Sequence, residues 1–267
     1  MAVLTVSREY GSGGREIGRA VAESLGYQYI DKSRILSAIS AMGEKWGEWG
    51  KNLDEHCPTI WEKYDWSFRG FGALIQSNIL NFALRDKVVI IGRGGNFLLK
   101  KIPFALRIRI VAPVEKRLEN IAKRENVDND TARWLIEKTD SERSCFIYSL
   151  YGRRWDDPEQ YDMLFDTGTR TLDEIINIVK ESLLDKEKFN TEKAREILRM
   201  RALAAEVKSV ILTDPSFFVP MLDVYSDGET IILRGTIHNP KEHKRIEDIA
   251  KKLSKGVPLK CELHYRG

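Results

Sequence analysis

A glycine-rich segment near the amino terminus is the part of the sequence best suited to chemistry. It reads SREYGSGGREIG from Ser7 to Gly18, between a short apolar run and an amphipathic helical pattern. Glycines allow backbone N–H groups to converge on a phosphate, and the start of a helix adds a favourable dipole. A tight turn that merely joins a strand to a helix is the alternative, but the context favours a phosphate-binding loop. The candidate phosphate-binding residues are Gly11, Ser12, Gly13, Gly14, Arg15 and Glu16.

This loop departs from the standard G-x-x-x-x-G-K-[ST] phosphate-binding motif. When Gly14 is aligned with the second glycine, Glu9 replaces the first glycine, Arg15 the lysine and Glu16 the hydroxyl residue. Arginine can still clamp phosphate oxygens through its planar fork. A carboxylate at Glu16 would repel phosphate unless a metal ion or Arg8 neutralises it. These replacements are therefore expected to affect catalysis more than phosphate binding.

The elements that must position this loop are those of an α/β domain. Short apolar runs predict strands, and helical spacing of apolar residues separates them. This alternation favours a parallel sheet with right-handed crossovers and flanking helices. The predicted strands are 3–6, 27–30, 87–91, 106–111 and 163–166, and the predicted helices are 17–25, 68–85, 114–125, 131–148 and 172–184. The region 32–66, rich in tryptophan and glycine, is too irregular for assignment.

The pattern of apolar and charged residues changes after residue 185. The charged stretch 186–193 is a candidate linker, so we expect one domain over 1–185 and a second over 194–267. The second has the predicted order α-β-β-α-β, a small α+β unit. Its predicted elements are helix 194–212, strand 217–225, turn 226–228, strand 230–236, helix 240–253 and strand 259–265.

Composition narrows the class of protein. The chain has 267 residues, with 43 Lys and Arg against 40 acidic residues, and a net charge of +3 does not indicate a nucleic-acid partner. We expect a cytoplasmic protein, because no secretory signal or long apolar span is present. Cys57, Cys145 and Cys261 are odd in number and far apart in sequence. They are expected to be buried reduced thiols, without a disulfide or a metal site.

Three segments together resemble the cytidylate-kinase-like branch of the nucleoside monophosphate kinases. They are the string SREYGSGGREIG, the Ile30-Asp31-Lys32 that ends the second predicted strand, and VIIGRGG at 89–95. In such kinases a strand ends in Gly-Arg, and that arginine reaches the phosphate of the acceptor nucleotide. Arg93 matches it, and we favour this role over that of a surface arginine. Asp31 and, less strongly, Arg34 follow a strand at the carboxyl edge of the sheet, where α/β folds bind ligands.

The resemblance extends to the lid of these kinases. Residues 138–143, KTDSER, are similar to the lid helix, whose arginines neutralise charge on the transferring phosphoryl group. Arg143 is the main candidate, Arg153 and Arg154 are looser ones, and a solvated charged face is an equal alternative. Residues 157–168 resemble the family's closing segment, which has an architectural role. Tryptophans 46, 49, 61 and 66 fall where these kinases bind the monophosphate, but core or interface packing is favoured over base stacking.

The resemblance implies phosphoryl transfer from ATP, with Mg²⁺, to a nucleoside monophosphate, with CMP as the expected acceptor. The loop and Arg15 would hold the donor phosphates, Arg93 the acceptor phosphate, and Arg143 the charge between them. A nucleotide sensor that binds but transfers inefficiently is the alternative, motivated by Arg15 and Glu16. Phosphorylation of another small acceptor also stays open, because a fold does not fix a substrate.

The carboxyl-terminal unit resembles a BON domain. The resemblance lies in the D-G turn at 227–228, the strand ending LRGT at 233–236, and the helix that leads to Gly256-Val257. It implies a non-catalytic unit that contacts a membrane or another protein. Basic residues on the last helix could serve lipid contact, but an ordinary solvated face is favoured because acidic residues dilute them.

Overall fold

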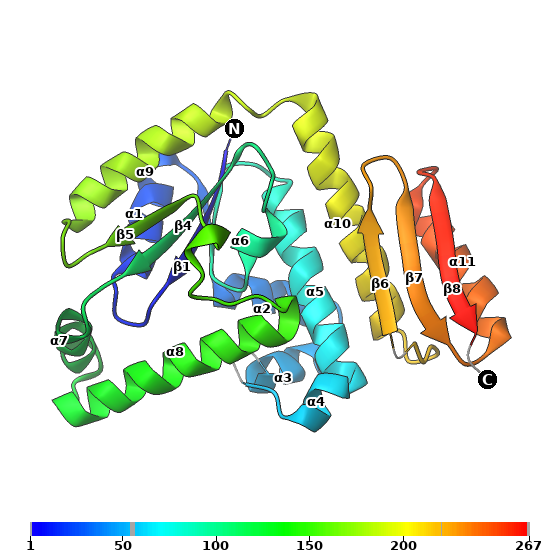
Figure 1. Cartoon of the computed structure of the whole chain (residues 1–267), viewed down its shortest axis with the longest axis horizontal. Coiled ribbons are helices and arrows are strands. Elements are labelled where there is room, and N and C mark those ends of the chain that lie inside the picture. The colour runs from blue at the N-terminus through cyan, green and yellow to red at the C-terminus, as the bar shows by residue number, and fades with distance from the viewer. Residues whose placement is uncertain (1, 54–56, 220, 266–267) are drawn as a thin grey trace.

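The computed structural model describes residues 2–53, 57–219 and 221–265. Within these residues, five parallel strands form the larger sheet in the order β2-β3-β1-β4-β5. Figure 1 shows β1, β4 and β5 of this sheet side by side. Its strands are β1 (Val3–Arg8), β2 (Gln28–Ile30), β3 (Val88–Ile91), β4 (Ala105–Val111) and β5 (Met163–Asp166). The predicted parallel α/β sheet is thereby confirmed, and β1, which leads into the glycine-rich loop, lies at its centre.

Helices cover both faces of this sheet. On one face lie α1 (Gly14–Leu25) and α9 (Leu172–Glu187), and α5 (Trp66–Ala83) packs against the other. Val89 and Ile91 of β3 point into the first core, while Val88 and Ile90 point into the second. This division follows from the alternation of side chains along a strand, and it explains why buried parallel strands are continuously apolar in sequence.

The unassigned region after β2 forms short helices around α5. These are α2 (Lys32–Ser40), α3 (Glu44–Leu53) and α4 (Ile60–Tyr64), and α6 (Gly95–Leu98) follows β3. Trp46 is buried in the core, and its ring centroid lies 5.5 Å from that of Trp66. Trp61, in contrast, is 85% exposed. Residues 54–56 of the tryptophan-rich stretch lie outside the described residues.

The predicted lid is a helical hairpin. It consists of α7 (Val114–Glu125) and the long α8 (Asn129–Tyr151), which Figure 1 shows running from α7 towards α5. The Asp128 carboxylate caps α8 by accepting a hydrogen bond from the Thr131 N–H at 2.7 Å. Gly152 ends the helix in the left-handed region, as expected for a C-cap glycine.

One expectation about the cysteines is wrong. Cys57 and Cys145 form a disulfide, with their Cα atoms 5.2 Å apart. The two residues are 88 positions apart in sequence, so their proximity arises only when α8 packs beside the α3–α4 segment. Cys261 is the thiol that stays free among the described residues. Burial raises its pKa to about 11.

The carboxyl-terminal unit has the predicted order of elements. They are α10 (Glu192–Thr213), β6 (Met221–Ser226), β7 (Ile231–Ile237), α11 (Pro240–Ser254) and β8 (Leu259–Tyr265). The strands form a sheet in the order β6-β7-β8, antiparallel between β6 and β7 and parallel between β7 and β8. The resemblance of this unit to BON domains stays a prediction.

Helix α10 belongs to two cores at once. Its first half buries Ala194 and Leu198 in the core that contains α5, and its second half buries Val207 and Ile211 against the small sheet. Figure 1 shows α10 between α5 and β6. The division into domains at 186–193 stays a proposal. Among the described residues, none of the helices has the length and apolar character needed to cross a membrane.

Candidate active site

The glycine-rich loop joins β1 to α1 and has the backbone geometry of a phosphate cradle. Gly11 and Gly13 have φ angles of 84° and 83°, in the region that residues with a side chain rarely adopt. Gly13 is the N-cap of α1 and provides no side-chain cap. The N–H groups of the first turn are therefore available to a ligand at the positive end of the helix dipole.

A pocket of about 780 Å³ opens over this loop. Its walls are the loop itself, the start of α2 and the end of α7, with Arg143 of α8 and Leu172 of α9 completing them. The volume falls within the range of roughly 300–1,000 Å³ that small-molecule sites occupy. Residues predicted as sites that line it are Gly11, Gly13, Gly14, Arg15, Glu16, Asp31, Arg93 and Arg143. Ser12 is buried beneath it, where its hydroxyl donates to the Glu9 carbonyl at 2.9 Å.

Three arginines from separate elements meet beside the loop. Arg8 ends β1, Arg93 follows β3, and Arg143 lies on α8; all three line the main pocket and a small adjoining one. Arg93 is 4% exposed, and its carbonyl accepts a hydrogen bond from the Tyr151 hydroxyl at 2.6 Å. Burial raises the pKa of that tyrosine. These guanidinium groups concentrate positive charge next to the phosphate cradle.

Arg15 and Asp31 lie at the mouth of the pocket. The Arg15 side chain is 60% exposed, and its NH2 atom lies 3.9 Å from Asp31 Oδ2. The other Asp31 oxygen caps α2 by accepting a hydrogen bond from the Arg34 N–H at 3.2 Å. The Arg34 side chain is exposed and does not line this pocket. Arg15 is thus held loosely enough to turn towards a ligand.

The looser lid candidates lie outside the pocket. Arg153 and Arg154 follow the end of α8, and both are exposed. Arg154 forms an ion pair with Asp156 at 2.8 Å. The structure therefore brings Arg143, but neither of these two arginines, to the phosphate loop.

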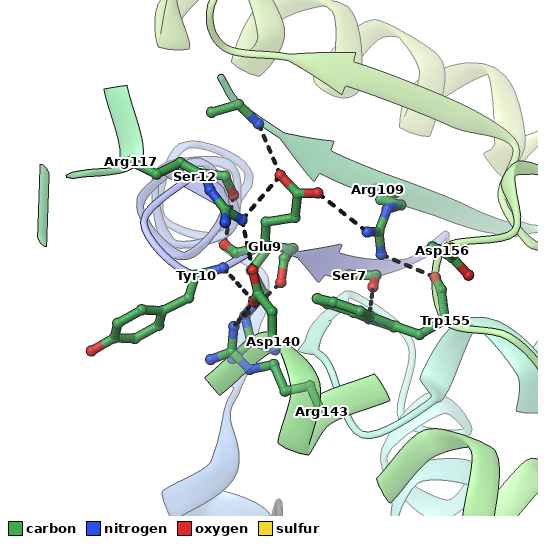
Figure 2. Close-up of polar contacts among 12 residues, drawn as sticks. Ser7, Glu9, Tyr10, Ser12, Arg109, Arg117, Asp140, Arg143, Trp155 and Asp156 are labelled. Carbon is green, nitrogen blue, oxygen red and sulfur yellow. Dashed lines mark hydrogen bonds and ion pairs between the residues drawn. The ribbon is translucent and has the colours of Figure 1, made fainter. Parts of the chain in front are cut away.

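A partly buried ion network attaches the loop to the lid, and Figure 2 shows it. Glu9 forms ion pairs with Arg117 at 3.2 Å and Arg109 at 3.6 Å, and it accepts a hydrogen bond from the Ala112 N–H at 3.2 Å. Arg117 also donates to Asp140 at 2.6 Å. The glutamate that replaces the first motif glycine therefore turns towards β4 and α7, where its charge is compensated.

Asp140 links α8 directly to the loop backbone. Its Oδ1 atom accepts a hydrogen bond from the Tyr10 N–H at 2.9 Å and lies 3.8 Å from Arg143 NH1. Arg143 in turn donates to the Arg8 carbonyl at 3.3 Å. Burial raises the pKa of Asp140, and the Tyr10 N–H and two arginines offset this only in part. The lid helix is therefore attached to the loop by contacts of Asp140 and Arg143 with its backbone.

These features agree with the comparisons to known proteins. A model described as the cytidylate kinase-like family matches residues 3–169, which is more than half of the chain. The chain belongs to this family. Within the cytidylate kinase-like family, the matched segment includes the loop, Arg93, Asp140 and Arg143, and it ends before α9.

Several relatives that are named cytidylate kinase come from archaea. The chain is 28% identical over 184 residues to a cytidylate kinase of Methanocaldococcus jannaschii, covering 68% of this chain and 97% of that one. It is 26% identical over 181 residues to a cytidylate kinase of Pyrococcus furiosus, covering 68% and 88%. A solved structure of an uncharacterized protein from Eubacterium ventriosum has a TM-score of 0.55 at 19% identity and covers 68% and 98%. That likeness supports the fold.

A buried polar layer below the arginines was not identified from the sequence. The Trp155 Nε1–H donates to the Ser7 hydroxyl at 2.8 Å, and the Tyr161 hydroxyl donates to the Trp155 carbonyl at 2.7 Å. Arg109 donates to the same carbonyl at 3.0 Å, with its guanidinium 4.3 Å from the Trp155 ring. The segment after α8 is thereby fixed to β1 and β4, which agrees with the architectural role expected for residues 157–168.

Proposed function

We propose that the chain transfers the γ-phosphoryl group of ATP to a nucleoside monophosphate, with CMP as the acceptor. Family membership and the archaeal relatives named cytidylate kinase support this proposal. The observation that carries it is the convergence of Arg8, Arg93 and Arg143 beside the glycine-rich loop. Such a site stabilises charge on a phosphoryl group in transit between two nucleotides, and it needs no nucleophilic side chain.

Each group has a distinct role in this proposal. The loop N–H groups and Arg15 hold the donor phosphates, because they line the open part of the pocket. Arg93, which is buried, holds the acceptor phosphate, and Asp31 lines the same pocket. Arg143 neutralises the charge that develops between the two nucleotides. Binding energy is thereby converted into alignment of the reacting oxygens.

The residues present fit a Mg²⁺ ion that arrives with the nucleotide. The described residues contain no cluster of three or more His, Cys, Asp or Glu side chains suited to a metal. Mg²⁺ bound with substrate phosphates commonly uses only one or two carboxylates. Glu16 and Asp31 both line the pocket and would supply them. When bound, the ion screens the phosphate charges, and it also removes the repulsion that Glu16 would otherwise exert.

The test is a coupled assay of ADP formation with ATP, Mg²⁺ and each of CMP, dCMP, UMP, AMP and GMP. We expect turnover with CMP, and a fall in kcat/KM of roughly 100- to 1,000-fold in Arg93→Ala, as for other lost transition-state contacts. Arg133→Ala is the matched control, because Arg133 is an exposed arginine of α8 outside the pocket.

Other outcomes would change the assignment. Turnover with a different monophosphate would correct the acceptor while keeping the reaction. An absence of turnover with all five, alongside measurable ATP binding, would favour the nucleotide sensor. Equal activity of the Arg93→Ala and Arg133→Ala variants would remove Arg93 from the site.

A further inference from the structure

A second cavity lies between α5 and the carboxyl-terminal sheet. It has a volume of about 660 Å³ and is lined by α5, the end of α8, α10 and all three strands of the small sheet. None of the residues that line it also lines the pocket over the phosphate loop. Its size is that of a site for a small molecule, and it is separate from the proposed nucleotide site.

The cavity combines an apolar floor with a cationic rim. Phe68, Leu212 and Leu222 contribute buried apolar surface. Among the described residues that line it, four side chains are cationic and one is a carboxylate. The cations are Lys63, Arg69, Lys208 and Arg234, and the carboxylate is Asp223.

Two of these cations already have acidic partners. Lys208 lies 3.3 Å from Asp223, and Arg234 lies 2.8 Å from Glu262. Arg69 differs from both. Its NH1 atom donates to the Val219 carbonyl at 3.0 Å, and within the described ranges no carboxylate pairs with it.

The unpaired charge of Arg69 is costly because the side chain is partly buried. Burial lowers the pKa of its guanidinium, and no acidic group in the described part of the chain offsets this effect. A desolvated cation is stabilised when an anion pairs with it, so an anionic group in the cavity would gain a charge-assisted hydrogen bond. The apolar floor gives the remainder of such a molecule a surface to cover.

We propose that this cavity binds a small anionic molecule with an apolar body, a carboxylate or a phosphate monoester. Its charged end pairs with Arg69, and its apolar part lies on Phe68, Leu212 and Leu222. Such a ligand contacts the kinase-like unit and the small sheet at the same time. It therefore stabilises their packing, because it binds the folded arrangement and not the unfolded chain.

The probe for this site is 8-anilino-1-naphthalenesulfonate, a fluorescent aromatic anion, titrated into the full chain. We expect saturable binding at one site, unchanged by excess ATP. Arg69→Gln weakens this binding roughly ten- to hundredfold, as expected for the loss of a charge-assisted hydrogen bond. Arg69→Lys keeps the charge and most of the affinity, and Arg133→Gln is the control for removal of a distant exposed arginine. Circular dichroism establishes that each variant is folded.

Competition experiments test the charged end and the apolar body of the ligand separately. Octyl phosphate should displace the dye, whereas inorganic phosphate and octanol at the same concentration should not. Equal affinity of the dye for the wild type and Arg69→Gln would overturn the proposal. Displacement by ATP, or equal displacement by inorganic phosphate and octyl phosphate, would overturn it as well. None of these outcomes depends on kinase activity, so the proposal can fail while the proposed function stands.

Discussion

At the residue scale, the arginines that line the candidate site are held in different ways. Arg93 has a φ angle of 56°, in the left-handed region, which costs of order 1–3 kcal/mol for a residue with a side chain. The hydrogen bond from Tyr151 to its carbonyl helps to maintain this conformation. Arg143 has an ordinary helical backbone and is oriented by Asp140 instead. A left-handed backbone conformation positions Arg93, and an ion pair with Asp140 positions Arg143. Both guanidinium groups line the same pocket.

Local motifs were sufficient to predict some of these residues. The glycine-rich loop and Arg93 were found because each motif lies within a few positions of a strand end. The ion network of Glu9, Arg117 and Asp140 was missed, because its members meet only through tertiary packing. Tyr10 and Asp140, for example, are 130 positions apart. The spacing of the charged residues on α8 could be read from the sequence. It did not show whether Asp140 contacts other residues or lies on a solvated face.

The Tyr10 ring leads to a prediction about the lid arginines. Its centroid lies 4.8 Å from the Arg124 guanidinium and 5.4 Å from that of Arg143. Each cation–π contact is worth about 0.5–1 kcal/mol at a partly exposed site. Given the proposed reaction, Tyr10→Leu should lower kcat about three- to tenfold by loosening these arginines, measured by steady-state kinetics with ATP and CMP.

A conservative variant separates the ring from the hydroxyl. The Tyr10 hydroxyl donates to Glu125 at 3.2 Å, and Tyr10→Phe removes this bond but keeps the ring. We expect Tyr10→Phe to retain near-normal kcat, and Tyr148→Leu, an exposed tyrosine of α8, to have no effect. A loss of activity in Tyr10→Phe equal to that in Tyr10→Leu would contradict a role for the ring.

At the element scale, α8 connects more parts of the molecule than its sequence suggested. It carries Asp140 and Arg143 towards the loop and Cys145 towards the α3–α4 segment. The prediction of a helix over 131–148 was close to the observed Asn129–Tyr151. Helices α2 to α4 were missed because they are short and their tryptophans and glycines obscure the helical period. The number of cysteines likewise gave no indication that Cys57 and Cys145 would form a disulfide.

The disulfide on α8 gives a prediction for stability. Closing a loop between residues 88 positions apart should stabilise the fold by about 4 kcal/mol, through the entropy of the unfolded chain. In urea denaturation without reductant, Cys145→Ser should therefore be less stable than the wild type by that amount. With a dithiol reductant, the two proteins should unfold at similar urea concentrations.

Cys261→Ser is the matched control for this experiment. Cys261 is free and lies in the small sheet, so its replacement should leave the effect of reductant unchanged. Thiol titration of the denatured wild type should give one free thiol per chain. Three free thiols in protein kept without reductant would show that the bond had not formed.

At the scale of the whole molecule, the shared helix α10 predicts cooperative unfolding of both units. Leu198 is 1% exposed in the core that contains α5. Leu198→Ala should cost about 3 kcal/mol, as is usual for a large-to-small core substitution. Because the same helix supports the small sheet, we expect both units to unfold earlier. Leu184→Ala, at a 55% exposed position of α9, should change stability by no more than about 0.5 kcal/mol.

Two probes can follow the two units separately. All six tryptophans lie before residue 186, so their fluorescence reports the first unit. Accessibility of the partly buried Cys261 thiol reports the small sheet. Coincident shifts of both transitions in Leu198→Ala are expected. A shift in tryptophan fluorescence alone would show that the units unfold independently.

The position of α10 in the chain also has a consequence for synthesis on the ribosome. The residues proposed to bind nucleotide have all been added by the time Arg143 is in place, yet the core beneath them includes Ala194, Leu198 and Ala202. Domains form during translation from the amino terminus onward. The nascent kinase-like unit therefore cannot complete its core until more than 50 further residues, roughly the distance from Arg143 to Ala202, have followed its last proposed catalytic arginine.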